Sequence, residues 1–352
     1  MVDSVEIGNQ RIGPGRPVYI VAELSANHNQ DFEQAQRLVH AAFECGANAV
    51  KLQTYTADSL TAKVDNQYFR IGKGTVWEGR TLHDLYGEAF TPWEWQPKLK
   101  ELAESLGLTL FSSPFDFRAV DFLEEMQVPA YKIASFEIVD LGLIRRAAET
   151  GKPVIISTGM ASIAEIEDAV RTVREAGSNQ IMLLKCTSAY PASPEEMNLR
   201  VIPDLARRFD VPVGLSDHTL ETTVPVAAVA LGACMIEKHL TLSRDIPGPD
   251  SSFSLEPCEF KMMVEAVRTT EKALGQLRYG PTKTEADTLV FRRSLFVISD
   301  IKEGEPFTSE NVRSIRPGHG LAPKHIREIL GERAARDIPK GTPLSWSDLA
   351  TG

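Results

Sequence analysis

The sequence predicts an α/β fold, a (β/α)8 barrel followed by a small β-rich domain. Short apolar runs recur eight times in the first 280 residues, and a segment with helical spacing follows most of them. The runs are 18–22, 49–52, 109–111, 130–133, 154–156, 181–184, 213–215 and 235–236. Eight strand–helix units in this length match a closed barrel. A doubly wound sheet is the alternative, because periodicity does not show closure.

The segments between the runs have the spacing of amphipathic helices. In 31–45 the apolar side chains recur with a period near 3.6, at Phe32, Ala35, Leu38, Val39, Ala42 and Phe43. The segments 163–176 and 222–231 repeat this pattern. Glycine, which is typical of helix C-termini, follows several expected helices, at Gly46, Gly107, Gly151, Gly177 and Gly232.

The pattern changes near Gly280 and Pro281, which predict the end of the barrel. We expect a barrel domain over 1–280, a linker over 281–290 and a small domain over 291–352. The small domain has β-like segments at 294–298 and 313–315 and one helical segment at 325–330, so we expect a compact β-rich module.

Composition limits the partners of the protein. The net charge of −10 over 352 residues disfavours nucleic acid and anionic membrane. There is no signal-peptide pattern and no apolar run of the roughly 18 or more residues that a membrane span needs. The cysteines, Cys45, Cys186, Cys234 and Cys258, are scattered without CxxC spacing. We therefore expect a reduced, cytoplasmic protein.

The connection 54–92 is too long for a plain loop. It carries Tyr55, Tyr68, Trp77, His83, Tyr86 and Phe90. Long ordered loops after barrel strands usually cover active sites. A surface excursion with its own small core is the alternative.

Polar and ionisable side chains gather where each expected strand ends. They lie in 23–28, 51–53, 112–116, 132–137, 157–159, 185–188, 216–218 and 237–239. Since catalytic groups of such barrels lie at these strand ends, an active site is expected there. Its lysines and hydroxyls suit a phosphate together with a carboxylate. Lys51 and Lys132, on apolar strands, are the main candidates; solvated surface charges are the alternative.

His218 and His239 end two successive strands. Neighbouring strands lie about 4.8 Å apart, so the two imidazoles could share a metal ion. With carboxylate and water as further ligands, Mn2+, Mg2+, Co2+ or Zn2+ would fit. A pair of hydrogen-bonded structural histidines is the alternative. Glu23 and Asp250 are candidates for orienting metal-bound water or a sugar hydroxyl.

Six motifs in these segments resemble the sialic acid synthase family. They are Val21–Asn29 (VAELSANHN), Lys51–Gln53 (KLQ), Lys132–Ser135 (KIAS), Gly214–Thr219 (GLSDHT), Glu237–His239 (EKH) and Pro247–Asp250 (PGPD). The C-terminal part, including Arg316-Pro317-Gly318, looks like that family's antifreeze-like (SAF) domain. The resemblance covers nearly the whole chain in order, which makes it far more specific than one short pattern.

The resemblance implies a barrel that binds a divalent metal, phosphoenolpyruvate and an N-acetylated amino sugar. It assigns phosphoenolpyruvate to Lys51, Lys132, Ser135, Ser157, Ser188 and Ser216. It assigns the metal to His218 and His239, with Glu23 nearby, and the sugar to Gln53, Glu137, Tyr190 and Asp250. It also implies a domain-swapped homodimer in which Arg316 reaches from the small domain into the partner's site.

Two departures bear on the sugar. N-acetylneuraminate-forming members carry Ile-Gly-x-Asn-His where this chain has Leu24–His28, and Ser188 stands where Asn is frequent. The first departure, with Thr91–Trp95 and Trp77–Tyr86, is similar to members that make pseudaminic acid from 2,4-diacetamido-2,4,6-trideoxy-altrose. The methyl and second acetamido group of that sugar suit an apolar pocket, which the aromatic loop could supply.

Alternatives remain open at this stage. Trp93 and Trp95 could be packing residues, and N-acetylneuraminate or legionaminate synthesis would use the same chemistry. We expect Glu23, Lys51, Lys132, His218 and His239 to be catalytic. A Schiff base at Lys132 or Lys185, acting on pyruvate without a metal, is a second enzyme class. An inert barrel that carries a carbohydrate-binding module is a third interpretation.

Overall fold

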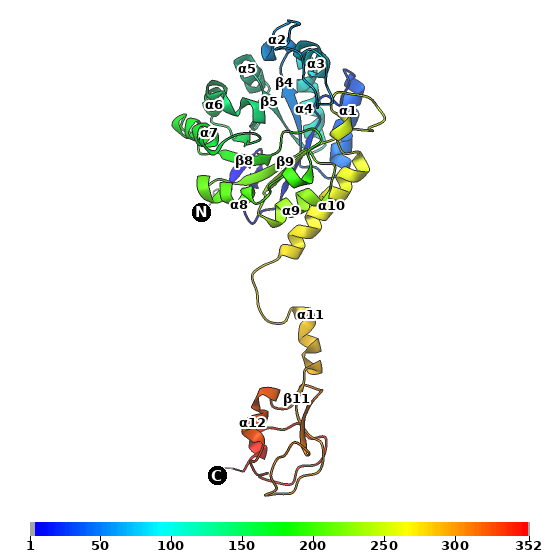
Figure 1. Ribbon diagram of the computed structural model, residues 1–352, viewed down its shortest axis with the longest axis vertical. Coiled ribbons are helices and arrows are strands. Elements are labelled where there is room, and N and C mark those ends of the chain that lie inside the picture. Colours follow the sequence, from blue (N-terminus) through cyan, green and yellow to red (C-terminus); the bar gives the residue numbers. More distant parts are fainter. Residues whose placement is uncertain (1–3, 351–352) are drawn as a thin grey trace. The chain divides into compact units, whose positions relative to one another are not determined.

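The computed structural model describes residues 4–350. The chain forms two compact units, one ending at Gly275 and the other beginning at Gln276. Figure 1 shows strands ringed by helices in the first unit and few regular elements in the second. The predicted linker, 281–290, falls within the second unit and contains a short helix and most of a 3-10 turn.

Eight parallel strands close into a barrel in the order β10-β3-β4-β5-β6-β7-β8-β9. They are β3 (Tyr19–Glu23), β4 (Ala49–Thr54), β5 (Thr109–Pro114), β6 (Tyr131–Ile133), β7 (Val154–Ser157), β8 (Ile181–Cys186), β9 (Val213–Asp217) and β10 (Met235–His239). β10 pairs with β3 from Met235↔Tyr19 to His239↔Glu23 and so closes the sheet. The predicted barrel is confirmed, and the doubly wound alternative is wrong.

Helices alternate with these strands (Figure 1). They are α1 (Phe32–Glu44), α4 (Gln96–Ser105), α5 (Phe117–Glu125), α6 (Leu141–Ala148), α7 (Ile163–Glu175), α8 (Val201–Phe209), α9 (Thr223–Ala230) and α10 (Pro257–Leu274). Asp31 caps α1 by accepting from the backbone N–H of Glu33 and Gln34. Gly46 follows α1 with φ +83°, a left-handed conformation that favours glycine. The predicted helix over 31–45 is therefore confirmed.

The barrel interior is apolar at one end of the strands. Tyr19, Phe111 and Met235 pack there with Val5 and Ile7 from an N-terminal hairpin. The hairpin, β1 (Val5–Ile7) and β2 (Gln10–Ile12), was missed by the sequence analysis because three-residue strands carry little periodicity. It fills the amino end of the barrel, so the polar residues at the carboxyl ends of the strands are left to form the site.

The long connection after β4 has structure of its own. It contains α2 (Ala57–Leu60), α3 (Leu82–Ala89) and a 3-10 turn, η1 (Trp93–Trp95). Between the two helices the chain folds back on itself, because Arg70 pairs with Thr81 in an antiparallel bridge. We call residues 55–90 the aromatic loop. Further 3-10 turns of the first unit are η2 (Ser135–Val139), η3 (Pro194–Glu196) and η4 (Ser251–Phe253).

The second unit has its own small core around two antiparallel strands. β11 (Ser294–Val297) pairs with β12 (Val312–Ile315), and both strands lie in the β-like segments predicted at 294–298 and 313–315 to within a residue. Phe307, Ile329 and Leu344 belong to this core. The other elements are α11 (Lys283–Ala286), η5 (Asp287–Phe291), η6 (Pro323–His325), α12 (Ile326–Ile329) and η7 (Trp346–Asp348).

The four cysteines are unpaired; Cys258 is exposed and the other three are buried. None of the helices within residues 4–350 has the length and apolar character needed to cross a membrane.

Candidate active site

Four charged side chains meet at the carboxyl end of the barrel, and we call them the anion cluster: Glu23, Lys51, Lys132 and Glu237. The Lys51 Nζ lies 2.6 Å from Glu23 Oε2 and 3.9 Å from Glu237 Oε1. The Lys132 Nζ donates to Glu237 Oε1 at 3.1 Å. All four are buried. Side chains alternate across a strand, and each member occupies an inward-facing position near the carboxyl end of its own strand.

The members of the anion cluster set one another's pKa values. Burial alone would raise the pKa of Glu237, but Lys132 and Lys51 lower it to about 2. Burial is also the largest influence on Lys132 and lowers its pKa, while Glu237 opposes this. Burial raises the pKa of Glu23, and nearby Lys51 only partly offsets this effect. Two cationic and two carboxylate groups thus hold each other in a water-poor site.

Two of the predicted anion-binding serines, Ser135 and Ser188, converge at Gly159. A Cβ on Gly159 would lie 2.6 Å from Ser135 Oγ and still closer to Ser188 Oγ, so only glycine leaves this space open. The Gly159 N–H donates to Ser135 Oγ at 3.2 Å. Ser157 Oγ is buried without a hydrogen-bond partner, and Ser216 Oγ donates to Glu237 Oε1 at 2.9 Å. The structure thus brings these hydroxyls to the strand ends, where they could bind oxygens of an anion.

The two predicted metal ligands face each other. The ring centroids of His218 and His239 are 5.4 Å apart. His218 Nδ1 donates to the Thr187 carbonyl at 2.9 Å, which leaves its Nε2 lone pair free for a metal. His239 Nδ1 is buried without a partner, and burial holds the pKa of His239 well below 6.5. Within residues 4–350, no three or more His, Cys, Asp or Glu side chains are grouped so that they could hold a metal ion together.

A cavity of about 380 Å³ adjoins this site, and we call it the sugar chamber. Its lining includes Gln53, Glu137, Tyr190, His239 and Asp250, so the structure brings all four predicted sugar-binding barrel residues together. Gln53 Nε2 donates to Glu23 Oε1 at 2.9 Å and thereby links the chamber to the anion cluster. Burial raises the pKa of Glu137 to about 7.

Aromatic rings from separate loops form one wall of the sugar chamber. Tyr190 packs on His218 with a centroid separation of 4.4 Å and on Phe253 at 5.0 Å. Trp77, from the aromatic loop, lies 5.6 Å from Tyr190. On the same loop, Tyr55 meets Phe115 at 5.2 Å. The predicted role of the loop as a cover for the site agrees with this placement.

Two tryptophans singled out from the sequence, Trp93 and Trp95, are not in the lining of the chamber. Trp93 donates from its indole N–H to the Tyr55 carbonyl, and Trp95 packs on His28, so both are packing residues. Arg316 belongs to the second unit, where it lines a hollow with Arg292.

Sequence reasoning placed Glu237 in a motif but missed it as a site residue. The available signal was that Glu237 and His239 are two residues apart on one short strand, so their side chains face the same side. Asp217 and Lys238 have the opposite parity and pair with each other at 2.5 Å, apart from the anion cluster. Ser25, which donates to Asp250, and Phe253 were also missed, because loop residues carry no such periodicity.

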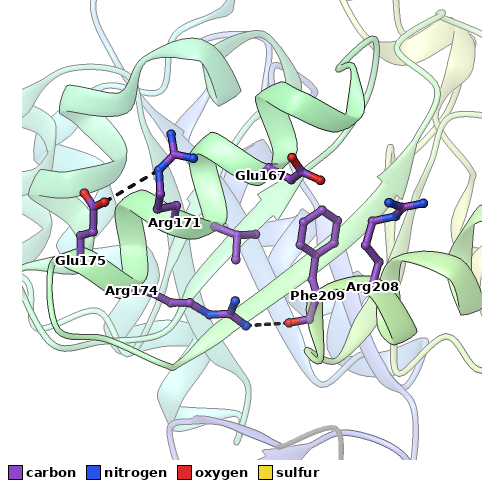
Figure 2. A pocket seen from close by; sticks show the side chains of 7 residues that line it. Glu167, Arg171, Arg174, Glu175, Arg208 and Phe209 are labelled. Atoms are coloured by element: carbon purple, nitrogen blue, oxygen red, sulfur yellow. Dashed lines mark hydrogen bonds and ion pairs between the residues drawn. The ribbon is translucent and has the colours of Figure 1, made fainter.

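A second hollow lies on the outside of the barrel between α7 and α8. Figure 2 shows that two of its arginines have protein partners: Arg171 pairs with Glu175, and Arg174 donates to the Phe209 carbonyl at 2.6 Å. Arg208 pairs with Asp204. It contains none of the predicted site residues. The barrel mouth is therefore the candidate active site.

The fold and this mouth define a (β/α)8-barrel enzyme whose active site lies at the carboxyl ends of the strands. Comparison with known proteins gives the family. Residues 38–279 match the NeuB family and residues 292–350 match the SAF domain, so the chain belongs to the NeuB family.

Named relatives and a solved structure agree with this assignment. The chain is 48% identical over 336 residues to the pseudaminic acid synthase of Helicobacter pylori, with 95% of this chain and 98% of that protein covered. It is 46% identical to the pseudaminic acid synthase of Campylobacter jejuni, with 98% and 100% covered. The crystal structure of the N-acetylneuraminic acid (sialic acid) synthetase of Leptospira borgpetersenii, in complex with citrate, matches with a TM-score of 0.73 and 33% identity, covering 82% and 96%.

Proposed function

We propose that this enzyme condenses phosphoenolpyruvate with 2,4-diacetamido-2,4,6-trideoxy-altrose to give pseudaminic acid and phosphate. The observation that carries the proposal is the buried pair Lys51 and Lys132 next to a chamber with an aromatic wall, to which Glu23 and Gln53 link them. The lysine pair suits a phosphate and a carboxylate, and the chamber suits a sugar with apolar substituents. The names of the relatives at 46% and 48% identity support the same product.

In the proposed reaction, C3 of phosphoenolpyruvate attacks the aldehyde carbon of the open-chain sugar. Positive charge then develops at C2, where water adds, and the tetrahedral intermediate loses phosphate by C–O cleavage. Lys51 and Lys132 neutralise the phosphate and carboxylate oxygens as charge moves onto them. Glu23 positions the water and accepts its proton, a role that its raised pKa favours.

His218 and His239 would hold a divalent ion (Mn2+, Mg2+ or Co2+), and such an ion would supply Lewis-acid polarisation of the sugar aldehyde. Charge balance supports this. The two lysines and two glutamates of the anion cluster cancel, so a phosphate and a carboxylate would leave the mouth negative without a cation. Titration calorimetry with Mn2+ alone should give binding in the wild type and a loss of binding in His239→Ala.

Phosphate release from phosphoenolpyruvate, with Mn2+ and one sugar at a time, tests the reaction. The sugars are the diacetamido-trideoxy-altrose, its legionaminic-pathway counterpart and N-acetylmannosamine. Turnover with the first alone is expected; turnover only with another would keep the chemistry and change the product. With ¹⁸O in the bridging position of phosphoenolpyruvate, C–O cleavage puts the label in phosphate. Reduction by borohydride that traps pyruvate on Lys132 or Lys185 would instead favour a Schiff-base enzyme.

The proposal includes a domain-swapped homodimer in which Arg316 completes the partner's site. Lys132→Ala and Arg316→Ala, each expected to be nearly inactive alone, would be co-expressed with different tags. Mixed dimers should regain about half of the wild-type activity, because one of their two sites is then complete. Full activity of Arg316→Ala alone would contradict the swap. A cytoplasmic location is also part of the proposal, and the four unpaired cysteines support it.

A further inference from the structure

Two chemically different sets of side chains line the sugar chamber. The barrel mouth contributes hydrogen-bonding groups: Ser25, Gln53, Glu137, His239 and Asp250. The aromatic loop contributes the aliphatic side chains that we call the aliphatic end, Leu60, Ile71, Leu82, Leu85 and Ala89, together with Tyr55, Thr75, Trp77 and Tyr86. The reacting aldehyde must lie among the hydrogen-bonding groups, beside His239 and the anion cluster. The opposite end of the sugar therefore points toward the aliphatic side chains.

The aliphatic end is held in place by a hydrogen-bonded fold of the loop. Ile71 N–H donates to the Arg80 carbonyl at 2.9 Å, and Gly79 N–H donates to the Ile71 carbonyl at 3.0 Å. Leu82 N–H donates to the Phe69 carbonyl at 2.8 Å, so Ile71 and Leu82 lie on paired segments. These backbone bonds hold the two segments together, and both side chains line the chamber.

Trp77 connects the aromatic loop to the other loops that line the chamber. Its indole N–H donates to the carbonyl of Pro249, in the loop after β10, at 2.7 Å. Its ring packs on Tyr190 and Phe253, with centroid separations of 5.6 and 6.1 Å. One side chain thus joins the aromatic loop to two other loops of the mouth. A partly buried indole with its N–H satisfied combines an apolar contact with a fixed orientation.

The five aliphatic side chains offer no hydrogen-bond partner, and the hydroxyl groups that the aromatic loop adds to the lining belong to Tyr55, Thr75 and Tyr86. A hydroxyl buried against the aliphatic side chains would lose its bonds to water, whereas a methyl group would gain from burial. Such a site discriminates a methyl from a hydroxymethyl group by roughly 10–200-fold, the range found for small changes in apolar pockets.

We propose that Ile71 and Leu82, enclosed by Trp77, form the subsite that selects the deoxygenated, methyl-bearing C6 end of the sugar. This inference rests on the proposed function and deepens it: it assigns specificity to the aromatic loop. Ile71 and Leu82 contact the methyl end directly. Trp77 is a positioning residue that acts through Tyr190 and the loop.

The test uses two sugars that differ by one oxygen, the diacetamido-trideoxy-altrose and its 6-hydroxy counterpart. Ile71→Thr puts a hydroxyl into the subsite and should lower the preference for the 6-deoxy sugar, measured as the ratio of kcat/KM, by about tenfold. Most of this change should be in KM, because the contact lies away from the reacting carbon. Val76→Thr makes a similar change at an exposed position of the same loop and should leave the ratio unchanged.

Trp77→Ala should raise KM for both sugars more than it lowers kcat, and Trp77→Phe should recover part of the loss because it keeps a ring. An unchanged ratio in Ile71→Thr, with a wild-type melting temperature, would overturn the inference, as would a wild type that does not distinguish the two sugars. If either result is obtained while the wild type still turns over the 6-deoxy sugar, the inference is wrong but the proposed function is unaffected. No turnover of any sugar by the wild type would overturn the proposed function itself.

Discussion

The anion cluster and the sugar chamber adjoin each other at Gln53, yet they are built in different ways. Each member of the anion cluster stands on a different barrel strand, at a position set by strand parity. The chamber takes its walls from loops that meet through ring contacts and single hydrogen bonds, such as that from Trp77 to Pro249. The backbone ladder of the barrel fixes the first, whereas local backbone bonds within the loop and side-chain contacts between loops hold the second.

This difference separates chemistry from specificity. Positions on a closed sheet cannot shift without breaking ladder hydrogen bonds, so the groups that meet phosphate and carboxylate are rigid. Loops tolerate change and carry selectivity in many barrels. Substitutions in the anion cluster should therefore abolish turnover, while substitutions in the chamber should redirect it.

The largest effect is expected for Lys132→Ala. It removes a cation that faces the reacting anion and leaves Glu237 with Lys51 at 3.9 Å. Turnover should fall by about 10³-fold, the size found when one donor to a developing charge is removed. Phosphate release measures this, and circular dichroism checks the fold. Activity within about tenfold of the wild type would show that the anion cluster is not where charge is stabilised.

Lys238→Met sharpens the comparison, since Lys238 is one residue along the same strand as Glu237 but points away from the mouth. It pairs with Asp217 at 2.5 Å and donates to the Thr219 carbonyl. Losing it leaves a buried, unpaired carboxylate, which should cost about 3–5 kcal/mol of folding free energy. Urea denaturation should record this loss, while kcat of the folded protein stays near wild type. A fall in kcat comparable with that of Lys132→Ala would contradict the parity argument.

The alternation of side chains along each strand also explains which parts of the site could be predicted from sequence. Buried parallel strands read as apolar runs, and their ends carry polar residues because only there does the barrel interior open, so Lys51, Lys132 and the two histidines were found. Glu237 was missed although its parity with His239 pointed to it.

The chamber could be predicted only in outline. The loop was expected to supply aromatic groups, but Trp77 and Trp93 look alike in sequence. Only the fold of the loop turns Trp77 into the chamber and directs Trp93 to the Tyr55 carbonyl. The N-terminal hairpin was missed for the same reason: its role in filling the barrel depends on contacts far along the chain.

Glu137 lies at the boundary between the two regions, and its ionisation tests how dry that boundary is. Its folded-state pKa of about 7 lies above the ordinary 4.5, because burial disfavours the charged form. The protonated carboxyl therefore adds to the free energy of unfolding. This contribution is fully present below pH 4.5 and is lost as the pH rises through about 7.

The glutamine in Glu137→Gln has no ionisable carboxyl group, so its contribution to stability does not change over this pH range. The variant should therefore gain stability relative to wild type across this range, by up to about 1.4 kcal/mol per pH unit and less where water reaches the carboxyl. Urea denaturation of both proteins at about pH 5 and about pH 8 measures the difference. Equal pH dependence in the two proteins would mean that Glu137 is well solvated and that the chamber is open to water.

The smallest effect is expected for Trp93→Phe, which separates packing from specificity within the loop region. It removes the 3.1 Å hydrogen bond to the Tyr55 carbonyl but keeps a ring against Phe122, 4.8 Å away. The cost should be about 1 kcal/mol, the usual value of one hydrogen bond, with KM for the sugar unchanged. Thermal melting and steady-state kinetics check the two parts. If KM rises as far as in Trp77→Ala, the two tryptophans support the chamber equally, and selectivity belongs to the loop as a whole rather than to its aliphatic end.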